Sequence, residues 1–332
     1  MQLDVLWYTD EPEKKIGVAM RRCYTTYPIE TIQEEVSREY GEYLVAAAYE
    51  RYEFDVYEHV RMLCVAKASE REMLDTILNH RYVEATALDQ KWLLSLNLRT
   101  ALEAARAGEE AFSHAVHEVC PRVARMVEGG KKPDRPSRRE VAPQEFPPSP
   151  RVSVLQSLTP RMIAGFLSEQ GYPRPAVEEL AQHCFFTFEA EGISRVATHQ
   201  LVRHRPAAYS QESQRFSAAV HEEFILPDTI RENSEALAVA TSALNSARGA
   251  YERLRGLGIR KEDARFMLPL GTGTKLMMTI TARYLRHITF FRSSSSPIGE
   301  KAQWEIRAIA DQMLSKAREL MPEIDWTPKE AL

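Results

Sequence analysis

A chain of 332 residues, 44% of them hydrophobic, is long enough to bury one large core or two cores of roughly 150 residues each. Its formal net charge of −4 argues against a general polyanion-binding protein, because domains that bind duplex nucleic acid usually carry an overall basic face. Four cysteines lie far apart without a CxxC pair, which indicates reduced thiols of a cytoplasmic protein and neither a metal site nor a disulfide framework. We find no apolar run of about 18 residues and no charged-then-apolar leader, so we expect neither membrane insertion nor secretion.

Apolar periodicity predicts the elements of the first half. QLDVLWYTD, from residue 2, is a short apolar run suited to a strand, and residues 11–26 follow at helical spacing. Residues 34–54 and 70–108 are rich in Ala, Leu, Glu and Arg, so both stretches are predicted to be largely helical.

Residues 128–150, EGGKKPDRPSRREVAPQEFPPSP, replace apolar periodicity with Gly, Pro and charge. This composition is typical of a solvated linker. It predicts a first domain over 1–128, a linker over 129–150 and a second domain over 151–332.

The second half mixes a predicted strand, CFFTFEAE at 184–191, with long helices. Over 231–256 apolar residues recur at alternating steps of three and four, which predicts one buried helix face made of Leu237, Ala240, Leu244, Ala247, Tyr251 and Leu254. Strands interspersed with several long helices indicate an α+β fold and not regular βαβ winding.

Local positive charge gathers in LVRHRPAAYSQESQRFS, residues 201–217. Guanidinium groups present forked donors that match phosphate geometry, so Arg203, Arg205 and Arg215 are candidate phosphate ligands. A solvated helix end or a hub of salt bridges explains an Arg-His-Arg tripeptide equally well. Arg265, Arg283 and Arg292 lie in apolar surroundings and need either carboxylates or a polyanionic ligand.

The spacing of this stretch, in which Arg-His-Arg is followed after seven residues by Ser213 and then by Arg215, resembles the signature of the flavin-dependent thymidylate synthases. CFFTFEAEGISRVATHQLVRHR upstream, and KEDARFMLPL, TARYLRH and AQWEIR downstream, are similar to the family's segments in the same order, so the resemblance covers about 165–315. It implies methylation of dUMP to dTMP, with methylenetetrahydrofolate giving the carbon and FAD passing a hydride from NADPH. It also implies a cytoplasmic homo-oligomer with flavins at subunit junctions.

The resemblance also implies roles for individual residues. FAD would contact Arg203, His204, Arg205, Gln211, Arg283 and His287. The nucleotide dUMP would contact Gln200, Arg203, Gln211, Ser213, Arg215, Arg265 and Arg292. Arg292 is implied as the catalytic residue, because a fixed cation stabilises the negative charge that develops as N3 of the uracil ionises. We assign no protein nucleophile: Cys184 is expected in the core, and Ser213 has no evident base beside it.

Some family features are missing from the second half and recur in the first. Thr281-Ala282-Arg283 stands where the family has Asn-x-Arg, and Gln182-His183 stands where it has Glu-His. The first half supplies Glu58-His59 and Asn97-x-Arg99, whereas His80-Arg81 is all that resembles the signature there. We therefore interpret the chain as two tandem domains of this family, each a mostly antiparallel sheet flanked by long helices, of which the first is degenerate.

This interpretation leads to a hypothesis of a composite flavin site, in which Arg203, His204 and Arg205 meet Glu58, Asn97 and Arg99. Two chains would then form a pseudo-tetramer in which half of the sites are empty. In the alternative, the first half is a scaffold, Glu58 is a surface acid and Arg99 is a salt-bridge partner.

Two other function classes remain open. One is a nucleotide- and flavin-binding protein of the same fold that has lost methyl transfer, which the change at Thr281 makes conceivable. The other, less favoured by the acidic balance, is a nucleic-acid-binding module that uses the Arg-rich stretch.

Overall fold

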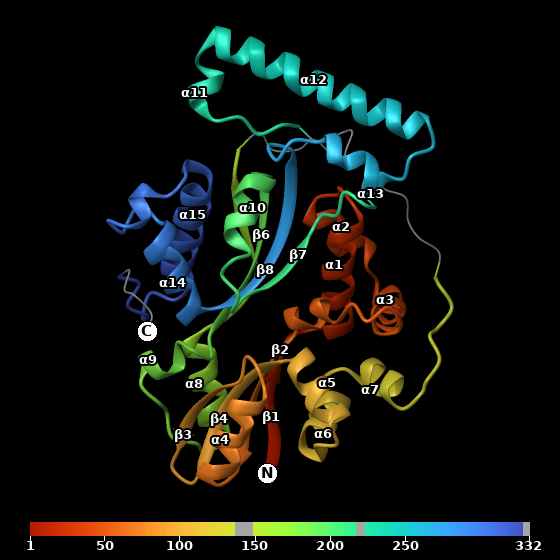
Figure 1. Cartoon of the computed structure of the whole chain (residues 1–332). Coiled ribbons are helices and arrows are strands. Elements are labelled where there is room, and N and C mark those ends of the chain that lie inside the picture. Colours follow the sequence, from red (N-terminus) through yellow and green to blue (C-terminus); the bar gives the residue numbers. More distant parts are fainter. Residues whose placement is uncertain (137–148, 217–222, 328–332) are drawn as a thin grey trace.

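A computed structural model describes residues 1–136, 149–216 and 223–327. They form two four-stranded sheets, one in each half of the chain, in which every strand pairing is antiparallel (Figure 1). Helices flank both sheets, which confirms the α+β prediction. The predicted linker falls largely on residues outside the described ranges; before and after it, a helix ends at Val127 and a strand begins at Arg151.

The first half consists of β1 (Gln2–Tyr8), α1 (Pro12–Tyr24), α2 (Ile29–Glu35), α3 (Arg38–Glu50), η1 (Phe54–His59), β2 (Arg61–Lys67), α4 (Glu70–Asn79), β3 (Glu84–Leu88), β4 (Lys91–Asn97), α5 (Leu98–Arg106), α6 (Glu110–Val119) and α7 (Pro121–Val127). The second half consists of β5 (Arg151–Leu158), α8 (Pro160–Glu169), α9 (Val177–Leu180), β6 (Phe185–Ser194), α10 (Arg195–Leu201), β7 (Ala208–Gln211), α11 (Asp228–Arg231), α12 (Ser234–Gly256), α13 (Lys261–Ala264), η3 (Arg265–Met267), β8 (Gly273–Thr281), α14 (Ala282–Arg292), η4 (Gly299–Lys301) and α15 (Trp304–Leu320).

The prediction of helix across 70–108 is wrong between residues 84 and 97, where β3 and β4 lie. The β4 sequence KWLLSLN lacks polar alternation because both faces of this strand are covered. Leu94 and Leu96 belong to the core of the first half, whereas Leu93 packs into the core of the second. A continuous apolar run of this kind cannot be told from a buried helix by periodicity alone.

The two halves share one topology. Their sheets have the orders β1-β2-β4-β3 and β5-β6-β8-β7, so the strands of each half occur in the order first, second, fourth, third. Both outer pairs also carry a register irregularity at the same place, at Val5/Trp7 and at Val154/Gln156. The strand register therefore defines equivalent residues: Arg61 pairs with Asn97 as Phe185 pairs with Thr281.

The halves are joined by a reciprocal pair of buried histidines. His59 Nδ1 and Nε2 lie 2.9 and 3.0 Å from the hydroxyls of Thr279 and Ser210 in the second half. His183, at the equivalent position, lies 2.9 and 2.8 Å from Ser95 and Thr86 in the first half. Burial lowers the pKa of both imidazoles to about 3, so both rings are neutral at pH 7.

We expect these histidines to make the fold sensitive to acid. Because their pKa in the folded protein lies below the unfolded value near 6.5, their contribution is complete above pH 6.5 and declines as the pH falls toward 3. Each should remove up to about 1.4 kcal/mol of unfolding free energy per pH unit within that window. Urea titrations at pH 7 and pH 5.5 measure this loss, and His183→Gln should reduce it by about half. An equal loss in that variant would contradict the assignment.

The long helix α12 lies across one end of the molecule, away from both sheets (Figure 1). Of the apolar face predicted for it, Tyr251 is buried at 1% exposure, against Ala264 and Leu268, but the other five residues are half-buried. The prediction of a core-facing stripe is therefore correct at the carboxyl end of α12 and wrong along the rest, because few elements of this chain cover it.

Candidate functional site

The Arg-His-Arg segment follows α10 and lies beside the end of α14. Arg292 Nε donates to His204 Nε2 across 3.5 Å, and the rings of His204 and His287 meet edge to face at 5.9 Å. Burial, with Arg292, His287 and Arg203 nearby, lowers the pKa of His204 to about 4. Within the described ranges, no ion pair joins a carboxylate to Arg203 or Arg292. We call Arg203, His204, His287 and Arg292 the cation cluster.

The equivalent place in the first half is neutralised. His80, the counterpart of His204, lies 2.7 Å from the Glu109 carboxylate. Residue 103, which corresponds to His287, is a glutamate that accepts from Arg99. In the first half, carboxylates therefore pair with the residues that correspond to the signature, whereas the cation cluster of the second half has no such partner in the described ranges.

The remaining signature residues lie at the other end of β7 or beyond it. Gln211 donates to the Thr198 and Thr274 hydroxyls at 3.1 and 3.3 Å. Arg215 Nε pairs with the Glu262 carboxylate at 3.2 Å, and Arg265 Nε donates to the Glu262 backbone carbonyl at 3.2 Å. The structure thus brings Arg215 and Arg265 together, but it separates them from Arg203 and Arg292 by the length of β7.

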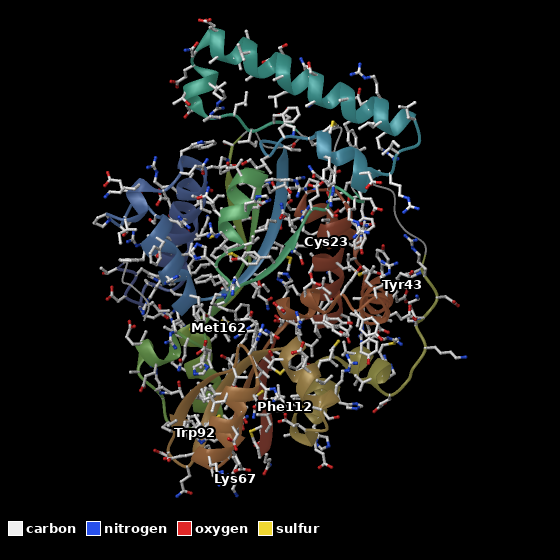
Figure 2. The ribbon with its side chains drawn as sticks, in the orientation of Figure 1. Cys23, Tyr43, Lys67, Trp92, Phe112 and Met162 are labelled. Carbon is white, nitrogen blue, oxygen red and sulfur yellow. The ribbon has the colours of Figure 1, made fainter. Side chains whose placement is uncertain are left out.

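Residues of the first half contact this end of the signature and the strands beside it. The sequence analysis did not predict these contacts. Ser213 N donates to the carbonyl of Cys23, the residue labelled near the end of α1 in Figure 2. Arg22, fully buried, pairs with the fully buried Glu189 of β6 at 2.7 Å. Lys275 Nζ donates to the Thr26 carbonyl at 2.5 Å. Such contacts between distant segments leave no short-range signal in a sequence.

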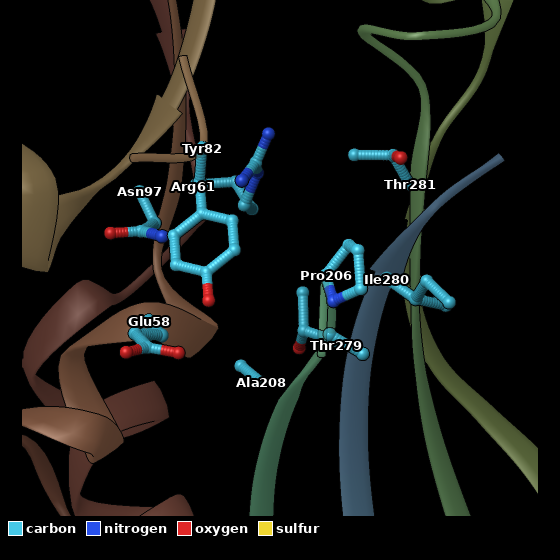
Figure 3. A pocket seen from close by; sticks show the side chains of 10 residues that line it. Glu58, Arg61, Tyr82, Asn97, Pro206, Ala208, Thr279, Ile280 and Thr281 are labelled. Carbon is cyan, nitrogen blue, oxygen red and sulfur yellow. The ribbon is translucent and has the colours of Figure 1, made fainter. Parts of the chain in front are cut away.

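A small pocket lies between the halves (Figure 3). Its lining is Glu58, Arg61, Tyr82 and Asn97 from the first half and Pro206, Ala207, Ala208, Thr279, Ile280 and Thr281 from the second. Glu58 accepts from Arg99 Nη1 at 2.8 Å, and burial raises the pKa of this carboxyl despite that arginine. Asn97 Oδ1 accepts from Thr100 N at 2.8 Å and so caps α5. We call this cavity the axial pocket.

Of the first-half residues in the composite-site hypothesis, two line the axial pocket and one does not. Glu58 and Asn97 line the axial pocket with Pro206, the residue after Arg205, and Tyr82 Oη donates to the Arg205 carbonyl at 3.3 Å. Arg99 pairs with both Glu58 and Glu103 and does not line the pocket.

Most of the other candidate residues are exposed or half-buried, and one of them lies near a carboxylate. Arg283 lies 3.6 Å from Glu84 and is exposed, Arg203 and Arg205 are exposed, and Gln200 is half-buried on α10. Cys184 is fully buried, as expected for a core thiol.

Other site types find no support in the described part of the chain. No group of three or more His, Cys, Asp or Glu residues there could hold a metal ion. No helix in those ranges is long and apolar enough to cross a membrane.

Comparison with known proteins shows what the second half of the chain is similar to. Residues 163–323 match the family model described as thymidylate synthase complementing protein. Flavin-dependent thymidylate synthases of Pyrococcus horikoshii and Nitratidesulfovibrio vulgaris are 43% and 40% identical over 156 and 164 residues, which is 45% and 47% of this chain. The chain spans 62% and 63% of the length of these relatives.

Among solved structures, a UMP/dUMP methylase, PolB, from Streptomyces cacaoi bound with 5-Br dUMP aligns with a TM-score of 0.44 and 22% identity. That alignment covers 54% of this chain and 94% of the methylase. The comparisons with the synthases confirm the resemblance of the second half to the flavin-dependent thymidylate synthases.

Proposed function

Since the second half of the chain resembles the flavin-dependent thymidylate synthases, we propose that this protein is a methyltransferase that converts dUMP to dTMP with reduced FAD and methylenetetrahydrofolate. The observation that carries the proposal is the cation cluster, which keeps its charge in the half that bears the signature and loses it in the other half. The test is dTMP formation by the purified protein supplied with FAD, a reductant, the folate and dUMP.

The cation cluster fits a phosphate-bearing cofactor. Arg203 and Arg292 stand within one cluster without a carboxylate in ion-pair contact in the described ranges, and like charges held together need an anion. The guanidinium fork suits a diphosphate, and His204 is neutral at pH 7, so it can donate through one ring nitrogen and accept through the other. Arg203, His204, Arg205 and His287 would hold FAD, with Arg283 and Gln211 as further contacts.

The nucleotide would be held by residues at both ends of β7. Gln200, Gln211, Ser213, Arg215 and Arg265 would fix dUMP, with Arg203 reaching it from the other end. Arg292 would stand over the uracil ring as a fixed cation and stabilise the charge that develops there at no cost of reorganisation. The bound flavin supplies the hydride of the reaction.

The first half would contribute Glu58, Asn97 and Arg99 to the flavin site. Asn97 and Glu58 already share the axial pocket with the segment after Arg205, and Arg99 holds the Glu58 carboxylate in place. The pairing of His80 with Glu109 supports one functional site in each chain.

We expect Asn97→Ala combined with Arg99→Ala to weaken FAD binding at least tenfold, because the pair loses an amide contact and the group that positions Glu58. Flavin fluorescence titration of the purified variant measures this change. Lys67→Ala, at an exposed position of β2, is the matched control and should bind FAD as the parent does. FAD affinity unchanged in the double variant would leave the first half as a scaffold.

Further features follow from the same proposal. NADPH would be the reductant, and two chains would assemble as a pseudo-tetramer in the cytoplasm, with flavins at the junctions. The half-buried apolar face of α12 supports an assembly that covers it.

A second candidate is a nucleotide- and flavin-binding protein without methyl transfer. It is favoured by Thr281, which replaces the family's asparagine and whose Oγ1 is buried without a hydrogen-bond partner in the described structure. Flavin and dUMP binding without dTMP formation would support it.

A further inference from the structure

The axial pocket contains a buried cation that no role above uses. Arg61 is 7% exposed and lies on β2 at the position that Phe185 occupies in the second half. Its Nη2 atom is buried and has no hydrogen-bond partner within the described ranges. Burial lowers the pKa of this guanidinium to about 10, so it still carries its charge at neutral pH.

The neighbouring carboxylates are paired with other arginines. Glu58 accepts from Arg99 at 2.8 Å, and Glu84 lies 3.6 Å from Arg283. Both acids act on Arg61 electrostatically, but neither forms an ion pair with it in the described structure. Both carboxylates are thus paired with other guanidinium groups, so the buried charge of Arg61 has no ion-pair partner in the described structure, and a bound anion would stabilise it.

Two neutral polar side chains line the same pocket as Arg61. The Asn97 amide uses its oxygen to cap α5, which leaves its NH₂ group to donate into the pocket. Thr281 lies across the pocket from Arg61 (Figure 3), and its Oγ1 atom is buried without a hydrogen-bond partner in the described residues. Asn97 and Thr281 occupy equivalent positions in the two halves, so the pocket lies where the halves meet.

We propose that the axial pocket binds a phosphate group, with Arg61 as its charged ligand and Asn97 and Thr281 as neutral donors. One guanidinium and two neutral donors match the acceptor oxygens of a phosphate, which can take several hydrogen bonds at once. The phosphate is either free or part of a larger ligand. This site is separate from the cation cluster and does not depend on methyl transfer.

Thermal unfolding of the full-length protein in inorganic phosphate tests the proposal. An Arg292→Leu background weakens the cation cluster, and sodium chloride holds the ionic strength constant. At ten times the dissociation constant, phosphate should raise the melting temperature by about 2 °C. Adding Arg61→Leu should abolish the rise, and Thr281→Val, a nearly isosteric change, should reduce it. Two results would overturn the proposal: no rise of the melting temperature in the Arg292→Leu protein, or a rise that stays the same when Arg61→Leu or Thr281→Val is added. In either case the pocket would hold only water.

Saturating FAD identifies the source of the phosphate. If FAD abolishes the Arg61-dependent response, the cofactor's own phosphates occupy the pocket. If the response persists, the pocket takes a separate phosphate-bearing ligand. Each of these outcomes supports the site, whereas an FAD-independent response that also survives Arg61→Leu would contradict it.

Discussion

Arg292→Leu should lower the turnover number for dTMP formation by about 10²–10³-fold and change the KM for dUMP much less. The reason is that the proposed role of Arg292 is to meet charge that exists in the transition state and not in the bound substrate. Arg292 is suited to this role because it lies half-buried beside His204 and, in the described ranges, no ion pair with a carboxylate quenches its charge. Steady-state kinetics with varied dUMP at saturating folate separate the two parameters.

Arg318→Leu is the matched control, since this arginine is exposed on α15. Its turnover should equal that of the parent. A raised KM with unchanged turnover in Arg292→Leu would show that Arg292 only binds dUMP. Turnover within threefold of the parent would remove it from the catalytic step altogether.

Arg22→Leu should destabilise the folded protein by about 3–5 kcal/mol, which is the usual cost of leaving one partner of a buried ion pair uncompensated. Arg22 and Glu189 are both fully buried, and they join α1 of the first half to the sheet of the second half. Removing both charges, in Arg22→Leu with Glu189→Leu, should restore much of the stability. Urea unfolding of the two variants measures the difference, and a loss below about 1 kcal/mol in the single variant would contradict this account.

The same variant should show a defined pH dependence. Burial, with Glu191 nearby, raises the pKa of Glu189 to about 7 even with Arg22 present. A carboxyl whose folded pKa is raised above its unfolded value of 4.5 costs no stability below pH 4.5, and its cost grows as the pH rises toward 7. The defect of Arg22→Leu should therefore be smaller at pH 5 than at pH 8. An equal defect at both would show that Arg22 acts by packing alone.

The sequence predicted those parts of the fold whose signals are local. The strand near residue 2, the helix after it and the strand at 184–191 are present. The signature stretch was recognised because its spacing survives within one short segment. By contrast, β3 and β4 were read as helix because both faces of β4 are buried between two cores.

The parts of the site that the sequence did not predict depend on contacts between the halves. Arg61 begins the strand RMLCVAK, and its unpaired state follows only from the pairing of Glu58 and Glu84 with other arginines. How far the apolar face of α12 is buried depends on which elements reach it, which periodicity does not encode. The equivalence of Asn97 and Thr281 became visible only from the strand register, because the two residues occupy the same position in the two sheets.

The most direct test of the central claim is an anaerobic turnover measurement on the full-length protein reconstituted with FAD and reduced with NADPH. The account predicts that adding dUMP and methylenetetrahydrofolate together restores the absorbance of oxidised flavin and yields one dTMP for each flavin reoxidised. Either component alone should yield no dTMP. A protein that binds no flavin, or whose flavin is reoxidised without dTMP, would contradict the proposed methyl transfer.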